Sequence, residues 1–137
     1  MWLKGHYIKS TTSVKLLGVH LDRELRWGQQ GAAAVGKGQT WLAKVRRLAR
    51  TSRGIKAGPM RRLYLATCVP RMLYAADVFL NPATARARTA TNSAVVRKMR
   101  TVQRGAALLI TGGLPSSPTD ALDACAGLLP IRHLVNR

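Results

Sequence analysis

Hydrophobic and polar positions change their spacing near residue 28, and this change divides the chain into two parts. In the first part, residues 2–9 and 14–22 are short stretches rich in apolar residues, and the polar residues 10–13 separate them. Such a pattern predicts two strands joined by a turn, which is a β-hairpin. Gly18 falls within the second predicted strand, where a glycine indicates a bulge or the close approach of a backbone or ligand.

From about residue 29 the apolar residues recur with helical spacing. One side of this predicted helix is apolar: Trp41, Leu42, Val45, Leu48 and Ala49. The other side is basic: Lys44, Arg46, Arg47 and Arg50. The stretch therefore predicts an amphipathic helix whose apolar face packs in a core.

Glycine and proline residues punctuate the next stretch. Gly54 ends the first helical pattern, and Pro59 suits the first position of a helix over residues 60–80. Pro70 removes a backbone donor within that helix, so we expect a kink or a division there. Residues 81–93 lack an apolar period and predict a mobile basic loop.

A second amphipathic helix is predicted to follow that loop. Its apolar residues recur at spacings of four and three: Val95, Met99, Val102, Ala106 and Leu109. Its polar face carries Arg97, Arg100 and Arg104. The pair Gly112–Gly113 ends it, and residues 117–120 resemble a capping box that starts a short helix running to about Ala126. Gly127 ends this short helix, and the residues from Ile131 look like the opening of another element.

The predicted fold class is mostly α with an N-terminal β-hairpin, an α+β fragment built around a bundle of basic helices. Three regions follow from the pattern. Residues 1–27 form the hairpin, and residues 28–113 form the helical region with its loop near 81–93. Residues 114–137 form a connecting segment. Both ends of the pattern look cut, so we expect a fragment of a larger protein.

Charge narrows the possible partners. The chain has 23 Lys and Arg residues against 5 Asp and Glu residues, a formal net charge of +18. A compact chain repels itself at this charge unless a polyanion is near. The natural polyanions are nucleic acid and an anionic membrane surface. The membrane surface is disfavoured because the basic helices lack the large aromatic or Leu anchors that insertion needs.

The basic residues gather on the polar faces of the predicted helices. Candidate nucleic-acid-binding cations are Arg46, Arg47, Arg50, Arg53, Lys56, Arg61, Arg62, Arg97, Arg100 and Arg104. An ordinary solvated face is the alternative, but such faces mix charges of both signs, and almost no acidic residue is available here. We therefore favour phosphate contact. Trp2, Trp27 and Trp41 are candidates for base stacking, although the place of Trp41 in the apolar stripe favours core packing.

Catalytic chemistry finds little support in the sequence. Asp77 stands without the second carboxylate that a two-metal polymerase site requires. Asp22 and Glu24 are the closest acidic pair, for which a turn or an ion pair with a neighbouring arginine is favoured over a metal site. The histidines His6, His20 and His133 lack the further ligands of a zinc site. No catalytic residue, metal or cofactor is therefore predicted for this chain.

Cysteines and hydropathy bear on the compartment. Cys68 and Cys125 are far apart and form no paired motif, which favours a reducing, intracellular setting. No apolar run approaches the roughly 20 residues of a membrane span, and no secretory signal precedes the first strand. We expect a nuclear or cytoplasmic protein that is not secreted.

Several motifs resemble the reverse transcriptases of non-LTR retrotransposons, the LINE or jockey-like elements. The first is Ser13-Val14-Lys15-Leu16-Leu17-Gly18-Val19-His20-Leu21-Asp22, followed by Leu25 and Trp27. In that family the segment corresponds to the primer-grip hairpin. The similarity continues in the same order through residues 62–64 and 70–78, which look like a thumb helix, and through residues 102–104 and 109–112. Residues 118–122 and 127–131 look like the connection that leads to an RNase H domain.

The resemblance implies a role within an RNA-directed DNA polymerase. The hairpin around Leu17 and Gly18 would position a primer end, and a thumb-like bundle of basic helices would hold an RNA/DNA primer-template through its phosphates. The family's paired-Asp motif and its RNase H domain are absent from this chain, so Mg²⁺ chemistry belongs to the complete enzyme only. The missing palm and RNase H regions of the parent polyprotein are the implied partners. The alternative is a free-standing basic RNA- or DNA-binding protein, associated with ribosomes or chromatin.

Overall fold

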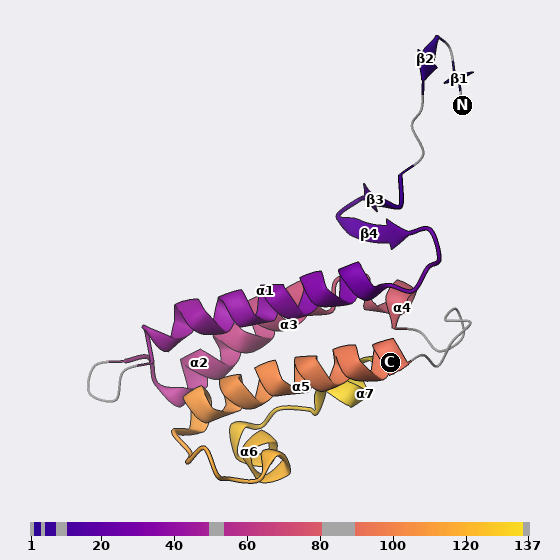
Figure 1. Cartoon of the computed structure of the whole chain (residues 1–137). Helices are drawn as coiled ribbons and strands as arrows, with labels where there is room; N and C mark the ends of the chain where they lie inside the picture. The colour runs from indigo at the N-terminus through magenta and orange to yellow at the C-terminus, as the bar shows by residue number, and fades with distance from the viewer. Residues whose placement is uncertain (1, 4, 8–10, 50–53, 81–89, 136–137) are drawn as a thin grey trace.

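Helices form most of the structure, and two small hairpins precede them. The computed structural model describes residues 2–3, 5–7, 11–49, 54–80 and 90–135 (Figure 1). The helical elements are α1 (Gly28–Arg46), α2 (Ala57–Leu63), the π-helical turn η1 (Tyr64–Cys68), α3 (Val69–Met72), α4 (Ala76–Phe79), α5 (Ala90–Thr111), α6 (Thr119–Ala126) and α7 (Ile131–Val135). The predicted class, mostly α with an N-terminal β-hairpin, is therefore confirmed.

Three helical layers make the bundle. In Figure 1, α1 lies along the continuous segment α2–η1–α3, and α5 runs beside both. The helices α6 and α7 pack against α5 on the side away from the hairpins. Among the described residues, no helix has the length and apolar character needed to cross a membrane.

The predicted hairpin pairing is wrong, because the apolar run of residues 14–22 folds back on itself. Strand β3 (Ser13–Leu16) pairs antiparallel with β4 (Val19–Asp22), and Leu16 lies opposite Val19. Only Leu17 and Gly18 form the turn, with φ angles of 48° and 83°. Two positive φ angles in a two-residue loop are the mark of a type I′ turn. Gly18 is thus a turn residue and not a bulge, and the strands β1 (Trp2–Leu3) and β2 (His6–Tyr7) pair with each other instead.

Asp22 joins the β3–β4 hairpin to α1. Its Oδ2 accepts a hydrogen bond from the Arg26 backbone N–H at 2.8 Å, and its Oδ1 accepts one from Trp27 at 2.9 Å. Burial acts to raise the pKa of this carboxyl, but the backbone donors, with the charge of Arg26, outweigh it and hold the pKa below its ordinary value. A second tie runs from the His20 backbone N–H to Gln30 Oε1, at 3.0 Å.

Pro70 divides the predicted helix of residues 60–80 by means of a π-helical turn. Helix α2 begins at Ala57, earlier than expected, and η1 follows it directly. At the end of η1 the Val69 N–H bonds to the Tyr64 carbonyl, five residues back. This wider turn makes room for a proline ring that would clash with the carbonyl four residues before it in a regular helix. A second break, with Ala75 at φ 59°, separates α4.

The core lies where α1 meets the other two layers. Its largest fully buried side chains include Met60, Tyr64, Met72, Phe79, Met99 and Ile131. The helices approach so closely at Gly38 that a Cβ there would stand 2.5 Å from Met72 Sδ and 2.9 Å from a Val102 methyl. Trp41, Leu42 and Val45 are buried as predicted, whereas Leu48 is exposed because α1 ends at Arg46.

The C-terminal boundaries agree with prediction except at one cap. Gly112 follows the end of α5 with φ 66°, and Gly127 ends α6 with φ 64°. The capping box at residues 117–120 is not formed, because Pro118 occupies the N-cap position and no side chain caps the helix. Most of the predicted loop at 81–93 lies outside the described residues, and its last four residues belong to α5.

Candidate nucleic-acid interface

A basic groove of about 770 Å³ lies where the β3–β4 hairpin meets α1 and α3. The hairpin contributes Lys15 and His20, α1 contributes Lys37, and α3 contributes Arg71. Its other walls are made by Leu17, Gly18, Ala33, Pro70 and Tyr74, so no carboxylate lines it. Three cations around one hollow create a positive potential that attracts anions. We call this site the basic groove.

The local fold explains why these cations meet. Lys15 and His20 are partners across the β3–β4 ladder, so their side chains share one face of the hairpin. Lys37 stands one helical turn after Ala33 on α1, and Arg71 directly follows Pro70 at the start of α3. The side chains of Lys15, Lys37 and Arg71 are all exposed.

Tyr74 links the three walls of the basic groove. Its hydroxyl donates a hydrogen bond to the Leu17 carbonyl at 2.9 Å. The Lys37 ammonium lies 5.5 Å from the centre of the Tyr74 ring, in a cation–π contact. The turn of the hairpin is therefore held beside α1 and the end of α3.

A stripe of cations leads from the basic groove along α1. Lys37, Lys44 and Arg47 are spaced by seven and three residues, which places them on one face of the helix, and all three are exposed. At 1.5 Å per residue the stripe is about 15 Å long. We call it the α1 stripe.

Other cations predicted to bind nucleic acid lie outside the basic groove. Arg46 is exposed at the end of α1, Lys56 is exposed directly before α2, and Arg62 is exposed in the last turn of α2. Arg97 is exposed on α5. Arg50 and Arg53 lie outside the described residues.

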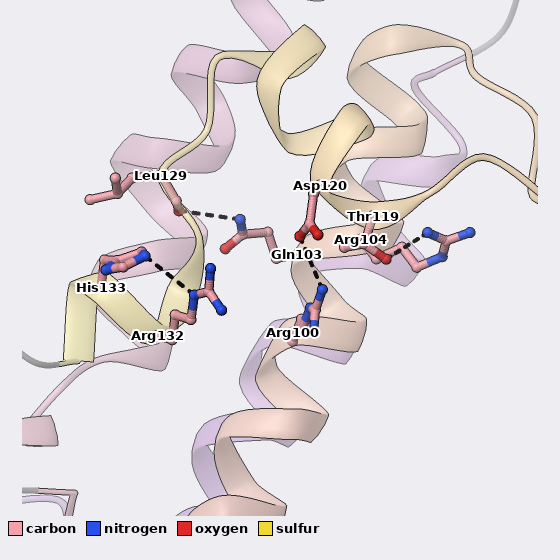
Figure 2. Close-up of polar contacts among 8 residues, drawn as sticks. All are labelled: Arg100, Gln103, Arg104, Thr119, Asp120, Leu129, Arg132 and His133. Atoms are coloured by element: carbon pink, nitrogen blue, oxygen red, sulfur yellow. Dashed lines mark hydrogen bonds and ion pairs between the residues drawn. The ribbon is translucent and has the colours of Figure 1, made fainter.

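Three predicted cations are engaged within the protein. Figure 2 shows Arg104 donating to Thr119 Oγ1 at 2.8 Å, and its second amino group bonds to the Pro115 carbonyl at 2.6 Å. Arg100 pairs with Asp120 at 3.1 Å in the same view.

The third engaged cation, Arg61, donates two hydrogen bonds to the Gly127 carbonyl, at 2.8 and 3.1 Å. Together with Arg100 and Arg104, this residue ties the segment after α5 to the bundle. Part of the predicted phosphate-binding set thus has a structural role.

The sequence patterns do not single out Lys15, His20, Lys37, Arg71 and Tyr74 as nucleic-acid-binding residues. The spacing of the α1 stripe was visible in the sequence and would have singled out Lys37. Grouping Lys15 with His20 required the turn at residues 17–18, which the predicted strand pairing had placed elsewhere.

Polar and aromatic residues elsewhere have local roles. Glu24 pairs with Arg26 at 2.6 Å, as the sequence favoured. Trp41 is in the core, where its Nε1–H donates to Thr67 Oγ1 at 2.8 Å. Burial raises the pKa of the Cys68 thiol to about 12, despite the opposing charge of Arg71.

Within the described ranges no group of three or more His, Cys, Asp or Glu residues is placed to hold a metal ion.

Comparison of the chain with protein-family models, with curated proteins and with solved structures finds no match in any of the three. The resemblance to non-LTR reverse transcriptases therefore rests on the sequence motifs alone.

Proposed function

We propose that this chain holds nucleic acid through its phosphates, with the basic groove as the main point of contact. The observation that carries the proposal is the meeting of Lys15, Lys37 and Arg71 around one hollow that no carboxylate lines. Ammonium and guanidinium groups bind phosphate oxygens strongly. Because such contacts position a strand without reading its bases, binding is expected to be independent of sequence.

The α1 stripe favours a polymer over a small anion. Each strand of a duplex carries a phosphate about every 3.4 Å along its axis. A stripe about 15 Å long therefore spans several phosphates of a strand that leaves the basic groove. The net charge of +18 supports the same class of ligand.

We further propose that the chain is a non-catalytic part of a retrotransposon reverse transcriptase. Support comes from the motif at residues 13–22, which forms the β3–β4 hairpin and lines the basic groove beside the helices. In such an enzyme the groove would hold an RNA/DNA primer-template, and the Mg²⁺ chemistry would reside in the palm of the complete protein. A free-standing basic binder would use the same groove without a preference for hybrid duplexes.

The test is binding of the purified chain to a fluorescent RNA–DNA hybrid across a salt series. We expect the affinity to fall steeply with salt, because each phosphate contact contributes up to about 0.9 to the slope of log K against log salt. The triple variant Lys15→Gln, Lys37→Gln, Arg71→Gln should reduce that slope by about 2–3.

A matched control removes the same charge elsewhere, with Lys56→Gln, Arg97→Gln and Lys98→Gln. This control should reduce the slope by less than half as much. Equal slopes for the two triple variants would contradict the proposal that the basic groove is the main contact.

One further measurement distinguishes a reverse-transcriptase fragment from a free-standing binding protein, and another tests the non-catalytic assignment. Tighter binding to the hybrid than to DNA or RNA duplexes of the same length supports the reverse-transcriptase role, and equal binding supports the free-standing protein. Incorporation of nucleotides by the purified chain with magnesium would contradict the non-catalytic assignment.

A further inference from the structure

Leu17 is the most exposed of the large apolar side chains among the described residues, at 85% of its full accessibility. It lies at the tip of the β3–β4 hairpin and lines the basic groove beside Lys15 and Lys37. An apolar side chain in this position gains nothing from water and has no core to enter. Its surroundings are the cations proposed above to bind phosphate.

The backbone at Leu17 is also unfavourable for a leucine. Its φ angle of 48° is in the left-handed region, which branched and bulky residues avoid. The first position of a type I′ turn favours asparagine, aspartate or glycine. Leucine is therefore a poor choice here for turn formation and for solvation, and strain of this kind is concentrated at functional sites.

The turn is held in place while its side chain is left free. The Leu17 carbonyl accepts the hydrogen bond from Tyr74, and the Tyr74 ring is covered by Lys37. The backbone of the tip is thus tied to the wall of the basic groove. The Tyr74 ring already contacts a cation, so Leu17 is the largest apolar side chain of the groove that is free to contact a base.

We propose that Leu17 is a wedge that packs against a base of the nucleic acid held in the basic groove and partly unstacks it. Apolar side chains such as leucine insert between base steps in other nucleic-acid-binding proteins, where neighbouring cations hold the phosphates. Here Lys15, Lys37 and Arg71 supply those cations. The inference rests on the proposed function and adds a base contact to it.

The test uses an RNA–DNA hybrid with 2-aminopurine placed at successive positions of the DNA strand, because its fluorescence rises when the base is unstacked. Binding of the unchanged protein should raise the fluorescence about twofold or more at one or two adjacent positions. Leu17→Asn should abolish this rise while keeping the salt slope of binding, because asparagine suits the turn and leaves the cations in place. Leu17→Met should retain the rise.

Leu25 provides a matched control. It is also an exposed leucine with a positive φ angle, 52°, but it does not line the basic groove. Leu25→Asn should leave the 2-aminopurine signal unchanged.

The outcomes distinguish the two proposals. Binding without a fluorescence change, or an undiminished signal in Leu17→Asn, would overturn the wedge and leave phosphate binding standing. A chain that binds no hybrid at low salt would overturn the proposed function, and the wedge with it.

Discussion

Basic side chains have opposite roles in the basic groove and at the contacts with the segment after α5. Arg61 of α2 and Arg104 of α5 donate to backbone carbonyls of the segment after α5, and Arg100 of α5 pairs with a carboxylate of that segment. In the basic groove, Lys15 and Arg71 have neither a hydrogen bond nor an ion pair among the described residues, and Lys37 contacts only an aromatic ring. The first set stabilises the fold, and the second is available to a ligand.

The number of cations on a helix therefore does not identify a binding surface. A guanidinium whose donors are already satisfied by carbonyls must lose those bonds before it can bind phosphate. A cation without a protein acceptor exchanges only water for phosphate. Acceptor geometry therefore separates the two sets. Substitutions at Arg104 and Asp120 test that separation, and substitutions at Asp22 and Tyr74 test how the hairpin of the basic groove is held.

The largest effect is expected at Arg104. Arg104→Gln removes its bonds to Thr119 and Pro115. The free energy of unfolding should fall by about 1.5–3 kcal/mol, since hydrogen bonds from charged groups contribute about that much, and the affinity for the hybrid should change little. Chemical denaturation measures the first quantity. The unfolding free energy of Arg97→Gln, at an exposed position of the same helix, should stay within about 0.5 kcal/mol of that of the unchanged protein. An equal loss in both variants would contradict a special structural role for Arg104.

Asp22 should show the next largest effect, with a defined pH dependence. Asp22→Ala removes two backbone hydrogen bonds at the start of α1. At neutral pH this should cost about 1–2 kcal/mol, the net contribution of two hydrogen bonds at a partly exposed site.

The sign of the pH dependence follows from the lowered pKa of Asp22. Because the pKa is lower in the folded state, the stabilisation is present above the unfolded value of 3.8 and is lost as the pH falls through the folded value. Denaturation of the unchanged protein and of Asp22→Ala at pH 7 and at about pH 2 measures this stabilisation. The difference in unfolding free energy between these two proteins should shrink in acid. A constant difference would show that the carboxylate charge has no role.

Tyr74 connects the hairpin tip to the helices, so its substitution should change both the free energy of unfolding and the affinity for the hybrid. Tyr74→Phe removes the hydrogen bond to Leu17 while keeping the ring beneath Lys37. We expect a loss of about 0.5–1 kcal/mol in stability, at the low end for a partly exposed hydrogen bond, and a weakening of hybrid binding by a few fold. Denaturation and a binding titration on the same sample test this. Unchanged binding would show that the tip of the hairpin need not be held in place.

The smallest effect on stability is expected at Asp120, whose ion pair with Arg100 is largely exposed. Asp120→Asn should change the unfolding free energy by less than about 1 kcal/mol, as exposed pairs contribute little. It removes the ion pair of Arg100 together with a negative charge, so hybrid binding should tighten at low salt and converge with the unchanged protein at high salt. Tightening that persisted at high salt would point to a cause other than charge.

Local patterns in the sequence predicted the helical part of the fold well. The apolar spacing around Trp41 and Met99 identified α1 and α5, and Gly112 and Gly127 marked the helix ends. The π-helical turn before Pro70 was anticipated only as a kink or a break. Each of these features depends on residues within one or two turns of one another.

The sequence could not predict contacts between distant segments. The fold-back at Leu17 was missed because leucine is a poor residue for a left-handed turn, so the run around it reads as one strand. The partners of Arg61 and Arg104 are 66 and 11 residues away, and no periodic pattern indicates them. The basic groove likewise gathers residues from three elements, so it was found only in three dimensions.

Lysine acetylation, with and without a bound RNA–DNA hybrid, tests the central claim most directly, because mass spectrometry reports each lysine separately. Lys15 and Lys37 line the basic groove, whereas Lys98 is exposed on α5 away from it. The account predicts that the hybrid slows acetylation of Lys15 and Lys37 strongly and leaves Lys98 unchanged. Equal protection of all three, or protection of Lys98 alone, would contradict the assignment of the basic groove as the nucleic-acid contact.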